Sequence, residues 1–252
     1  MCGRYASSRK PEDLVEEFEI DKVEVKETLA PDFNVAPTKP VYAVVQRPSR
    51  DADDGPAERQ LRTPTWGLVP FWAKDPAMGN KMINARMETV HEKPAFRQAF
   101  AKRRCLLPAD GYYEWYPTEQ LSKAGKPLKQ PFFIRPADGG VLAMAGLYEI
   151  WRDRTRDEDD PLRFKWTCTV LTTSAEDSVG HIHDRMPLLV EPDRYAAWLD
   201  PAGSADTDHL RSLLVPAAPG RLEAYPVSTQ VNNVRNNGPE LMDPLPAEGA
   251  GP

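Results

Sequence analysis

The sequence predicts a single α+β domain built mainly on antiparallel sheet. Segments rich in aromatic and β-branched residues cluster in the middle of the 252-residue chain, without regular alternation with helices. The 26 prolines favour turns and short helices over long ones. Hydrophobic residues make up 40% and charged residues 28%, as in ordinary globular proteins, and a chain of this length can bury one sizeable core.

The first predicted element is a helix over residues 10–20, KPEDLVEEFEI. Pro11 suits its first turn, and Leu14 and Phe18 share one face with Val15. Then follow a strand at 41–46, a polar loop at 47–60, an extended aromatic segment at 63–72 and a short helix at 93–104.

The second half of the chain contains four predicted strands and two predicted helices. The strands are 105–116, 131–135, 141–151 and 165–173, and the helices are 191–200 and 206–214. PADGG at 136–140 predicts a hairpin turn between the second and third of these strands, and 152–160 predicts a charged loop. We expect one domain over 1–240 and a flexible tail over 241–252.

Charge is unevenly distributed along the chain. The net charge of −6 does not favour nucleic-acid binding, because phosphate contacts need Lys and Arg. Residues 11–32 carry a local charge of −7, whereas residues 81–105 carry +5. The basic segment predicts either a nucleic-acid-binding face or, as is more common for such runs, a solvated surface.

Cysteine usage favours neither a disulfide framework nor structural zinc. Cys2, Cys105 and Cys168 are odd in number and lack the paired spacing of metal ligands. His181 and His183 are two residues apart, but too few other ligands support a metal site. No apolar run reaches the ~18 residues of a membrane span, and no signal peptide is evident, so we expect a cytoplasmic protein.

Two motifs combine polar groups with apolar neighbours. In INARMET, Asn84, Arg86 and Glu88 alternate with apolar residues and share one face of an extended strand, where they are either functional or merely solvated. In DGYYEWY, Glu114 lies among four aromatic residues. Apolar surroundings raise a carboxyl pKa and make it a general acid; the alternative is a surface-facing strand position.

A third motif, HIHDRMP, contains a candidate for proton transfer. Histidine has an unperturbed pKa near neutrality, so a single His183 suffices for general acid–base chemistry. Asp184 and Arg185 are placed to orient that ring or to bind an anion. Each of these motifs alone is weak evidence.

In combination, the motifs resemble the SRAP family, the abasic-site processing proteins also called SOS-response-associated peptidases. The resemblance covers nearly the whole chain through MCGRYA, NVAPT, WGLVPFWA, INARMET, CLLPADGYYEWY, PFFIR, IHDRMP and YPVSTQVNNVRNNGPEL, in that order. It implies a single domain with a β-rich, barrel-like core and flanking helices. It also implies binding of single-stranded DNA and covalent capture of abasic sites.

The resemblance assigns the family's catalytic residues to Cys2, Asn84, Glu114 and His183. Its DNA-contacting positions fall on Arg4, Phe71, Trp72, Arg86 and Arg185. Position 71 is Phe where some relatives carry Trp, which keeps an aromatic ring for stacking. No cofactor or metal is implied.

An N-terminal cysteine explains the capture chemistry that the resemblance implies. Once Met1 is removed, Cys2 carries an α-amine and a thiol on adjacent carbons. The amine can form a Schiff base with the ring-opened aldehyde of an abasic site, and the thiol can then close a five-membered thiazolidine ring. The reference pKa of about 7.7–8.0 leaves part of the α-amine neutral and nucleophilic at pH 7.

Three alternatives remain open. Cys2 is also the expected nucleophile of a cysteine-type peptidase, such as one that acts only on its own Met1. It would equally be the nucleophile of an N-terminal-cysteine amidotransferase, whose glutamine-binding motifs we do not find. In a pure binding module, Glu114 and His183 would be incidental. We expect a monomer without membrane association, in the nucleoid when bound to DNA, with single-stranded DNA containing abasic sites as its partner.

Overall fold

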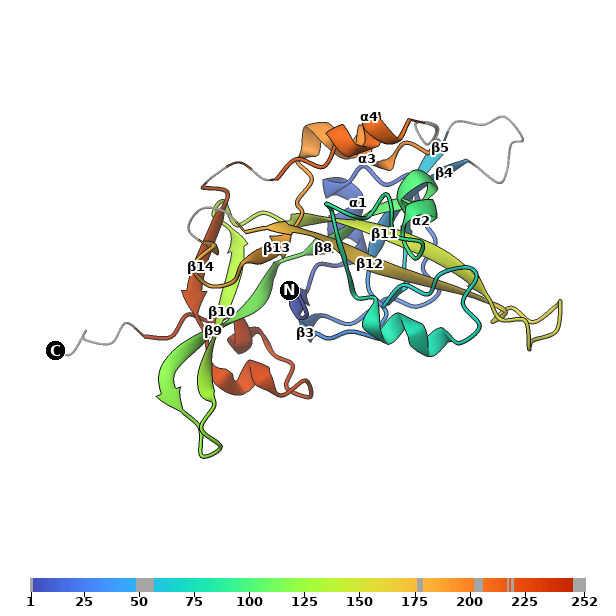
Figure 1. Cartoon of the computed structure of the whole chain (residues 1–252). Coiled ribbons are helices and arrows are strands. Elements are labelled where there is room, and N and C mark those ends of the chain that lie inside the picture. The colour runs from blue at the N-terminus through green and yellow to red at the C-terminus, as the bar shows by residue number, and fades with distance from the viewer. Residues whose placement is uncertain are drawn as a thin grey trace.

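A computed structural model describes residues 2–48, 57–175, 179–201, 206–216, 218 and 220–246. These residues form three layers: helices, a nine-stranded sheet and a five-stranded sheet (Figure 1). The α+β prediction is confirmed. In place of the expected barrel-like core, the structure has two separate sheets. Among the described residues, strand pairing does not close them into a barrel.

The nine-stranded sheet is the central layer. Its main path runs β13-β12-β11-β8-β4-β5-β2, with β6 and β7 paired to β12. Its strands are β2 (Lys22–Val23), β4 (Ala43–Pro48), β5 (Ala57–Arg62), β6 (Thr65–Trp66), β7 (Asn84–Arg86), β8 (Arg104–Ala109), β11 (Leu142–Arg152), β12 (Phe164–Ser174) and β13 (Arg185–Pro187).

The five-stranded sheet covers one face of the central layer. Its order is β14-β10-β9-β1-β3, and all its pairs are antiparallel. Its strands are β1 (Tyr5–Ser7), β3 (Asp32–Val35), β9 (Gly111–Leu121), β10 (Pro127–Pro136) and β14 (Leu222–Pro226). The apolar core between the two sheets includes Cys2, Tyr5, Trp66 and Tyr112.

The helices cover the opposite face of the central sheet. They are α1 (Pro11–Glu17), α2 (Arg97–Lys102), α3 (Tyr195–Leu199) and α4 (Thr207–Ser212). Elsewhere in the fold, short 3-10 turns occur at Pro76–Lys81, Pro192–Arg194, Thr229–Asn232 and Pro239–Met242. Leu14, Phe100 and Trp198 pack there against sheet residues such as Leu106. Alternation along β8 explains the division, because Leu106 faces the helices and Leu107 faces the second sheet.

Several local predictions are wrong. The predicted strand at 105–116 is divided between β8 and β9, which belong to different sheets. PADGG does form a turn, in which Gly139 N–H donates to Pro136 O, but it joins β10 and β11, which belong to different sheets. It therefore makes no hairpin. The predicted polar loop at 47–60 ends in strand β5, whose Leu61 is buried; part of that loop, 49–56, lies outside the described residues.

The C-terminal segment packs on the outer face of the five-stranded sheet. Leu241 is fully buried with Tyr113, Phe133 and Val231, and Leu245 N–H donates to Pro226 O. At the start of the expected tail, Leu241 therefore covers this second apolar face, whereas residues 243–246 are exposed. The remainder of the expected tail, 247–252, lies outside the described residues. Among the described helices, none is long and apolar enough to cross a membrane.

Candidate functional site

Cys2 lies between the two sheets at the start of the chain. Pairing of β1 with β9 aligns Tyr5 with Tyr112, and Tyr113 N–H donates to Arg4 O at 2.9 Å. Antiparallel continuation of this register brings residue 2 close to Glu114. The Cys2 side chain is 0% exposed. Burial, and then the charge of Glu114, raises the pKa of the thiol well above its usual value, so the sulfur is protonated at neutral pH.

Asn84 holds the backbone of residue 2. Its Nδ2 donates to Cys2 O at 2.7 Å. Strand β7 positions the amide through parallel pairing of Asn84 with Val170 on β12. Asn84 Oδ1 is buried and accepts no hydrogen bond from the described residues. A buried acceptor without a donor is costly, so this atom is available to a donor from a substrate or a free amine.

Glu114 is a buried carboxyl with a shifted pKa. It lies on β9 opposite Phe132 and is 4% exposed. Burial raises its pKa to about 7, and the charge of Asp184 adds to the rise. The expected rise in the pKa is thus found, and the surface-facing alternative is wrong; the role of general acid stays a prediction. A pKa near 7 allows proton donation and acceptance at neutral pH.

His183 follows a turn and precedes β13. Its Nδ1 accepts the Arg185 N–H at 2.9 Å, which places the proton of the neutral ring on Nε2. Asp184 Oδ1 lies 2.9 Å from the same Nδ1 and stabilises the protonated ring. Burial lowers the pKa of His183, and the charge of Lys129 contributes. His181 lies within the turn, so the two histidines do not share a strand face.

The Glu114 pKa predicts a pH dependence of stability. Because the folded pKa of about 7 exceeds the reference value of 4.5, the stabilisation from protonated Glu114 is complete below pH 4.5 and is lost as pH rises through 7. The loss amounts to roughly 3 kcal/mol at most. Glu114→Gln should remove this dependence. The unfolding free energy of the variant should therefore rise relative to that of wild type as pH increases from 4.5 to 7. Denaturant titrations at several pH values measure the unfolding free energy. Glu119→Gln, at an exposed position on the same strand, is the control. If the unfolding free energies of Glu114→Gln and wild type change with pH in parallel, the assignment is wrong.

Arg4 is committed to a structural network. Its Nη1 donates to Asn34 Oδ1 at 2.7 Å and to Val231 O at 2.8 Å, and its guanidinium lies 5.6 Å from the Trp115 ring centre. Asn34 is fully buried, and its Nδ2 donates to three backbone carbonyls of the C-terminal segment, those of Val231, Asn233 and Asn236. The network fastens the residues next to Cys2 to the C-terminal segment.

Arg86 and Arg185 lie on either side of the end of β12. Arg86 is exposed on β7 opposite Thr172. Arg185 binds Glu88 through two contacts of 2.6 and 3.0 Å, and its Nη2 donates to Thr172 O at 2.6 Å. The predicted alternation of polar and apolar residues in INARMET is confirmed within β7, where Ala85 is 1% exposed and lies between Asn84 and Arg86. Glu88 lies beyond the strand and partly neutralises Arg185.

Phe71 and Trp72 form an exposed aromatic pair in the irregular segment after β6. They are 48% and 44% exposed, which is unusual for large apolar side chains. The predicted extended segment at 63–72 is a strand only at Thr65–Trp66. The two rings are available to stack on a ligand, and DNA contact by these and the arginines stays a prediction.

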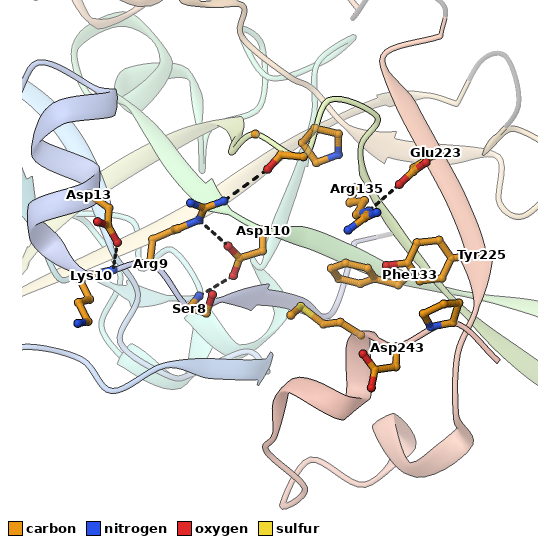
Figure 2. Close-up of a pocket in the computed structure, with 15 residues that line it drawn as sticks. Ser8, Arg9, Lys10, Asp13, Asp110, Phe133, Arg135, Glu223, Tyr225 and Asp243 are labelled. Atoms are coloured by element: carbon orange, nitrogen blue, oxygen red, sulfur yellow. Dashed lines mark hydrogen bonds and ion pairs between the residues drawn. The ribbon is translucent and has the colours of Figure 1, made fainter. Parts of the chain in front are cut away.

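A separate cavity of about 730 Å³ opens at the other end of β1 (Figure 2). Its charged groups are largely paired with one another: Arg9 Nε lies 3.2 Å from Asp110 Oδ1, and Arg135 Nε lies 2.6 Å from Glu223 Oε1. It contains none of the candidate catalytic residues. Within the described part of the chain, no group of three or more His, Cys, Asp or Glu side chains is arranged to hold a metal ion.

Sequence reasoning missed Asn34, Trp115 and Lys129. Asn34 falls inside the NVAPT motif, and a polar residue there, between apolar neighbours, was the only available signal. The contacts of Asn34 with the C-terminal segment span about 200 residues of sequence, for example 202 to Asn236. Such long-range contacts leave no local pattern.

Comparisons with known proteins identify the family. The family model described as SOS response associated peptidase (SRAP) matches residues 1–234. The abasic site processing protein YoaM of Bacillus subtilis is 39% identical over 243 residues, covering 96% of this chain and 98% of that protein. The abasic site processing protein YedK of Escherichia coli is 32% identical over 251 residues, covering 97% and 100%.

A solved structure shows the same fold. The crystal structure of a Bacteroides thetaiotaomicron protein matches with a TM-score of 0.76 at 24% sequence identity, covering 97% of this chain and 100% of that one. The family match spans both sheets and the segments that carry Cys2, Asn84, Glu114 and His183. The chain therefore belongs to the SOS response associated peptidase (SRAP) family.

Proposed function

We propose that the protein binds single-stranded DNA and captures abasic sites covalently through Cys2 after removal of Met1. The observation that carries the proposal is the hydrogen bond from Asn84 Nδ2 to Cys2 O, 2.7 Å long, which fixes residue 2 beside the buried Glu114 carboxyl. The names of the relatives, abasic site processing proteins, supply the substrate class.

The chemistry needs two additions and one dehydration. The α-amine of Cys2 adds to the aldehyde carbon of the ring-opened sugar, and loss of one water gives the imine. The thiol sulfur then adds to the imine carbon while its proton passes to the nitrogen, closing the thiazolidine. Glu114 supplies and removes the protons of these steps, and His183 assists opening of the sugar ring. Asn84 Oδ1 accepts a hydrogen bond from the amine.

The state of the thiol favours capture over peptidase chemistry. Catalytic cysteines of peptidases have a lowered pKa that maintains a thiolate. Burial instead raises the pKa of Cys2. In the proposed route the amine attacks first, and the thiol needs to react only with an imine already held next to it. High local concentration then compensates for weak intrinsic nucleophilicity.

DNA binding would rest on Arg86, Arg185 and the rings of Phe71 and Trp72. Each base stacked on an aromatic ring contributes roughly 1–3 kcal/mol. Arg86→Ala should flatten the dependence of log affinity on log salt by roughly 0.7, the value for one phosphate on single strands. Arg185→Ala should flatten it less, because Glu88 already neutralises that guanidinium. Fluorescence anisotropy across a salt series measures both slopes; a salt-independent affinity would leave the basic segment as a solvated surface.

A denaturing gel tests the proposed function. Wild-type protein is mixed with single-stranded DNA bearing one abasic site, or a reduced analogue of that site that has no aldehyde. We expect a heat-stable shifted band with the first DNA only. Cys2→Ala should lose the band and keep its non-covalent binding, whereas Cys168→Ala, which changes another buried cysteine of the same core, should keep both. Equal band yield from Cys2→Ala would refute the proposal.

A further inference from the structure

Strands β9 and β10 continue beyond the five-stranded sheet as a two-stranded arm. We call residues 116–130 the hairpin arm; Figure 1 shows it pointing away from the body of the protein. Its ladder pairs Tyr116 with Gln130 and Leu121 with Pro127. A turn closes it, with Gly125 N–H donating to Ser122 O at 2.9 Å. Neighbouring strands pair with β9 only up to Tyr112 and with β10 only from Phe132 onward.

The hairpin arm differs in charge from the rest of the protein. It contains Lys123, Lys126 and Lys129 and one acidic residue, Glu119, on a chain whose net charge is −6. It also exposes apolar side chains: Leu121 is 63% exposed, Leu128 45% and Tyr116 41%. A cationic ribbon with exposed apolar groups matches the surface of single-stranded nucleic acid, which offers phosphates and base faces.

The arm starts at the candidate catalytic site. Tyr116 follows Glu114 by two residues on β9, and its ring packs edge-on against Phe132, which lies opposite Glu114. The charge of Lys129, on the arm, makes a small contribution to lowering the pKa of His183, whose main cause is burial. A DNA strand that extends from the candidate site past Glu114 would therefore contact the hairpin arm.

Protection of an exposed strand edge is the competing explanation. Lysine and proline on edge strands prevent edge-to-edge aggregation, and Pro117 and Pro127 fit that role. Edge protection does not require exposed leucines. Large exposed apolar groups would instead increase aggregation.

We propose that the hairpin arm binds the DNA strand on one side of the abasic nucleotide, its lysines contacting phosphates and Tyr116 and Leu128 contacting bases. This inference rests on the proposed function. At about 3.3 Å per residue the arm reaches roughly 20 Å from Tyr116 to its turn. That length matches about six phosphates of a stacked strand.

The test compares two triple variants of the full chain. Lys123→Ala/Lys126→Ala/Lys129→Ala removes the arm lysines, and Lys10→Ala/Lys26→Ala/Lys165→Ala removes three exposed lysines elsewhere. Non-covalent binding to single-stranded DNA is measured across a salt series. The arm variant should flatten the salt slope by about 2 and weaken the Kd about tenfold at low salt, whereas the control should match wild type. A Lys→Arg triple variant of the arm should restore binding.

DNA of graded length locates the contact. One series lengthens only the 5′ side of the abasic site, and the other only the 3′ side. Wild type should gain affinity in one series alone, and the arm variant should lose that gain. Arm and control variants that bind alike would overturn the inference, as would an arm variant that aggregates while its DNA binding stays at the wild-type level.

The two proposals fail separately. If wild type forms the covalent adduct and the arm variant binds DNA like the control, the arm proposal is wrong and capture stands. If wild type binds DNA through the arm and forms no adduct with any abasic substrate, the capture proposal is wrong and the DNA-binding surface stands.

Discussion

A chain that retains Met1 is expected to form no heat-stable adduct with abasic DNA. With Met1 in place the nitrogen of Cys2 is an amide, whose lone pair is delocalised and cannot add to the aldehyde. The effect should be all-or-none, because the remaining thiol forms only a reversible hemithioacetal. A variant with an uncleavable extension before Cys2, compared with fully processed protein, makes the test.

Mass spectrometry must accompany that comparison to establish which chains begin at Cys2. The extended variant should still bind undamaged single-stranded DNA with the wild-type Kd, which controls for folding and for the DNA surface. Efficient adduct formation by a chain shown to retain Met1 would count decisively against the amine as nucleophile.

Replacing the thiol alone should convert stable capture into strand cleavage. Cys2→Ser with Met1 removed keeps the amine and has a much weaker second nucleophile, so its imine should persist. An imine acidifies the adjacent sugar carbon and promotes β-elimination 3′ to the lesion. We expect more cleavage per captured site, and less heat-stable adduct, than for wild type. A time course on one denaturing gel resolves intact, crosslinked and cleaved DNA.

Glu114→Gln is the informative companion to Cys2→Ser. It should slow both adduct formation and cleavage, because formation of the imine itself needs proton transfer. Cys105→Ser, at a buried cysteine in the same core, should behave as wild type. If Cys2→Ser neither cleaves DNA nor is trapped by borohydride, direct attack by the thiol becomes the better account.

Local patterns in the sequence predicted individual elements better than their pairing. The apolar spacing around Leu14 and the alternation around Ala85 are visible in a few neighbouring residues, and the structure confirms the helix and the strand. PADGG looked like a hairpin because its flanking strands are adjacent in sequence. The two sheets separate these strands, since β11 pairs with β8 and β12, and no local signal records that.

The same distinction applies to the candidate site. The raised pKa of Glu114 was expected from its apolar neighbours in sequence, and its physical cause in the structure is burial. Of those neighbours, Tyr112 packs in the core between the sheets, whereas Tyr113 and Trp115 pack on the outer face of the five-stranded sheet. The commitment of Arg4 could not be predicted, because one of its acceptors, Val231 O, is 227 residues away. Nor could the pairing of Arg185 with Glu88, which are 97 residues apart. Arg4 and Arg185 were both expected to bind phosphates because the sequence shows their charge. It does not show the distant groups that bind their guanidinium groups in the fold.

Intact-mass analysis of the product formed with abasic single-stranded DNA tests the central claim most directly. Processed wild-type protein should give one covalent species, with the summed mass of protein and DNA less one water and without any reducing agent. Peptide mapping should place the link on Cys2, with both its nitrogen and its sulfur blocked. An adduct attached through another residue, or no adduct from chains shown to begin at Cys2, would contradict thiazolidine capture.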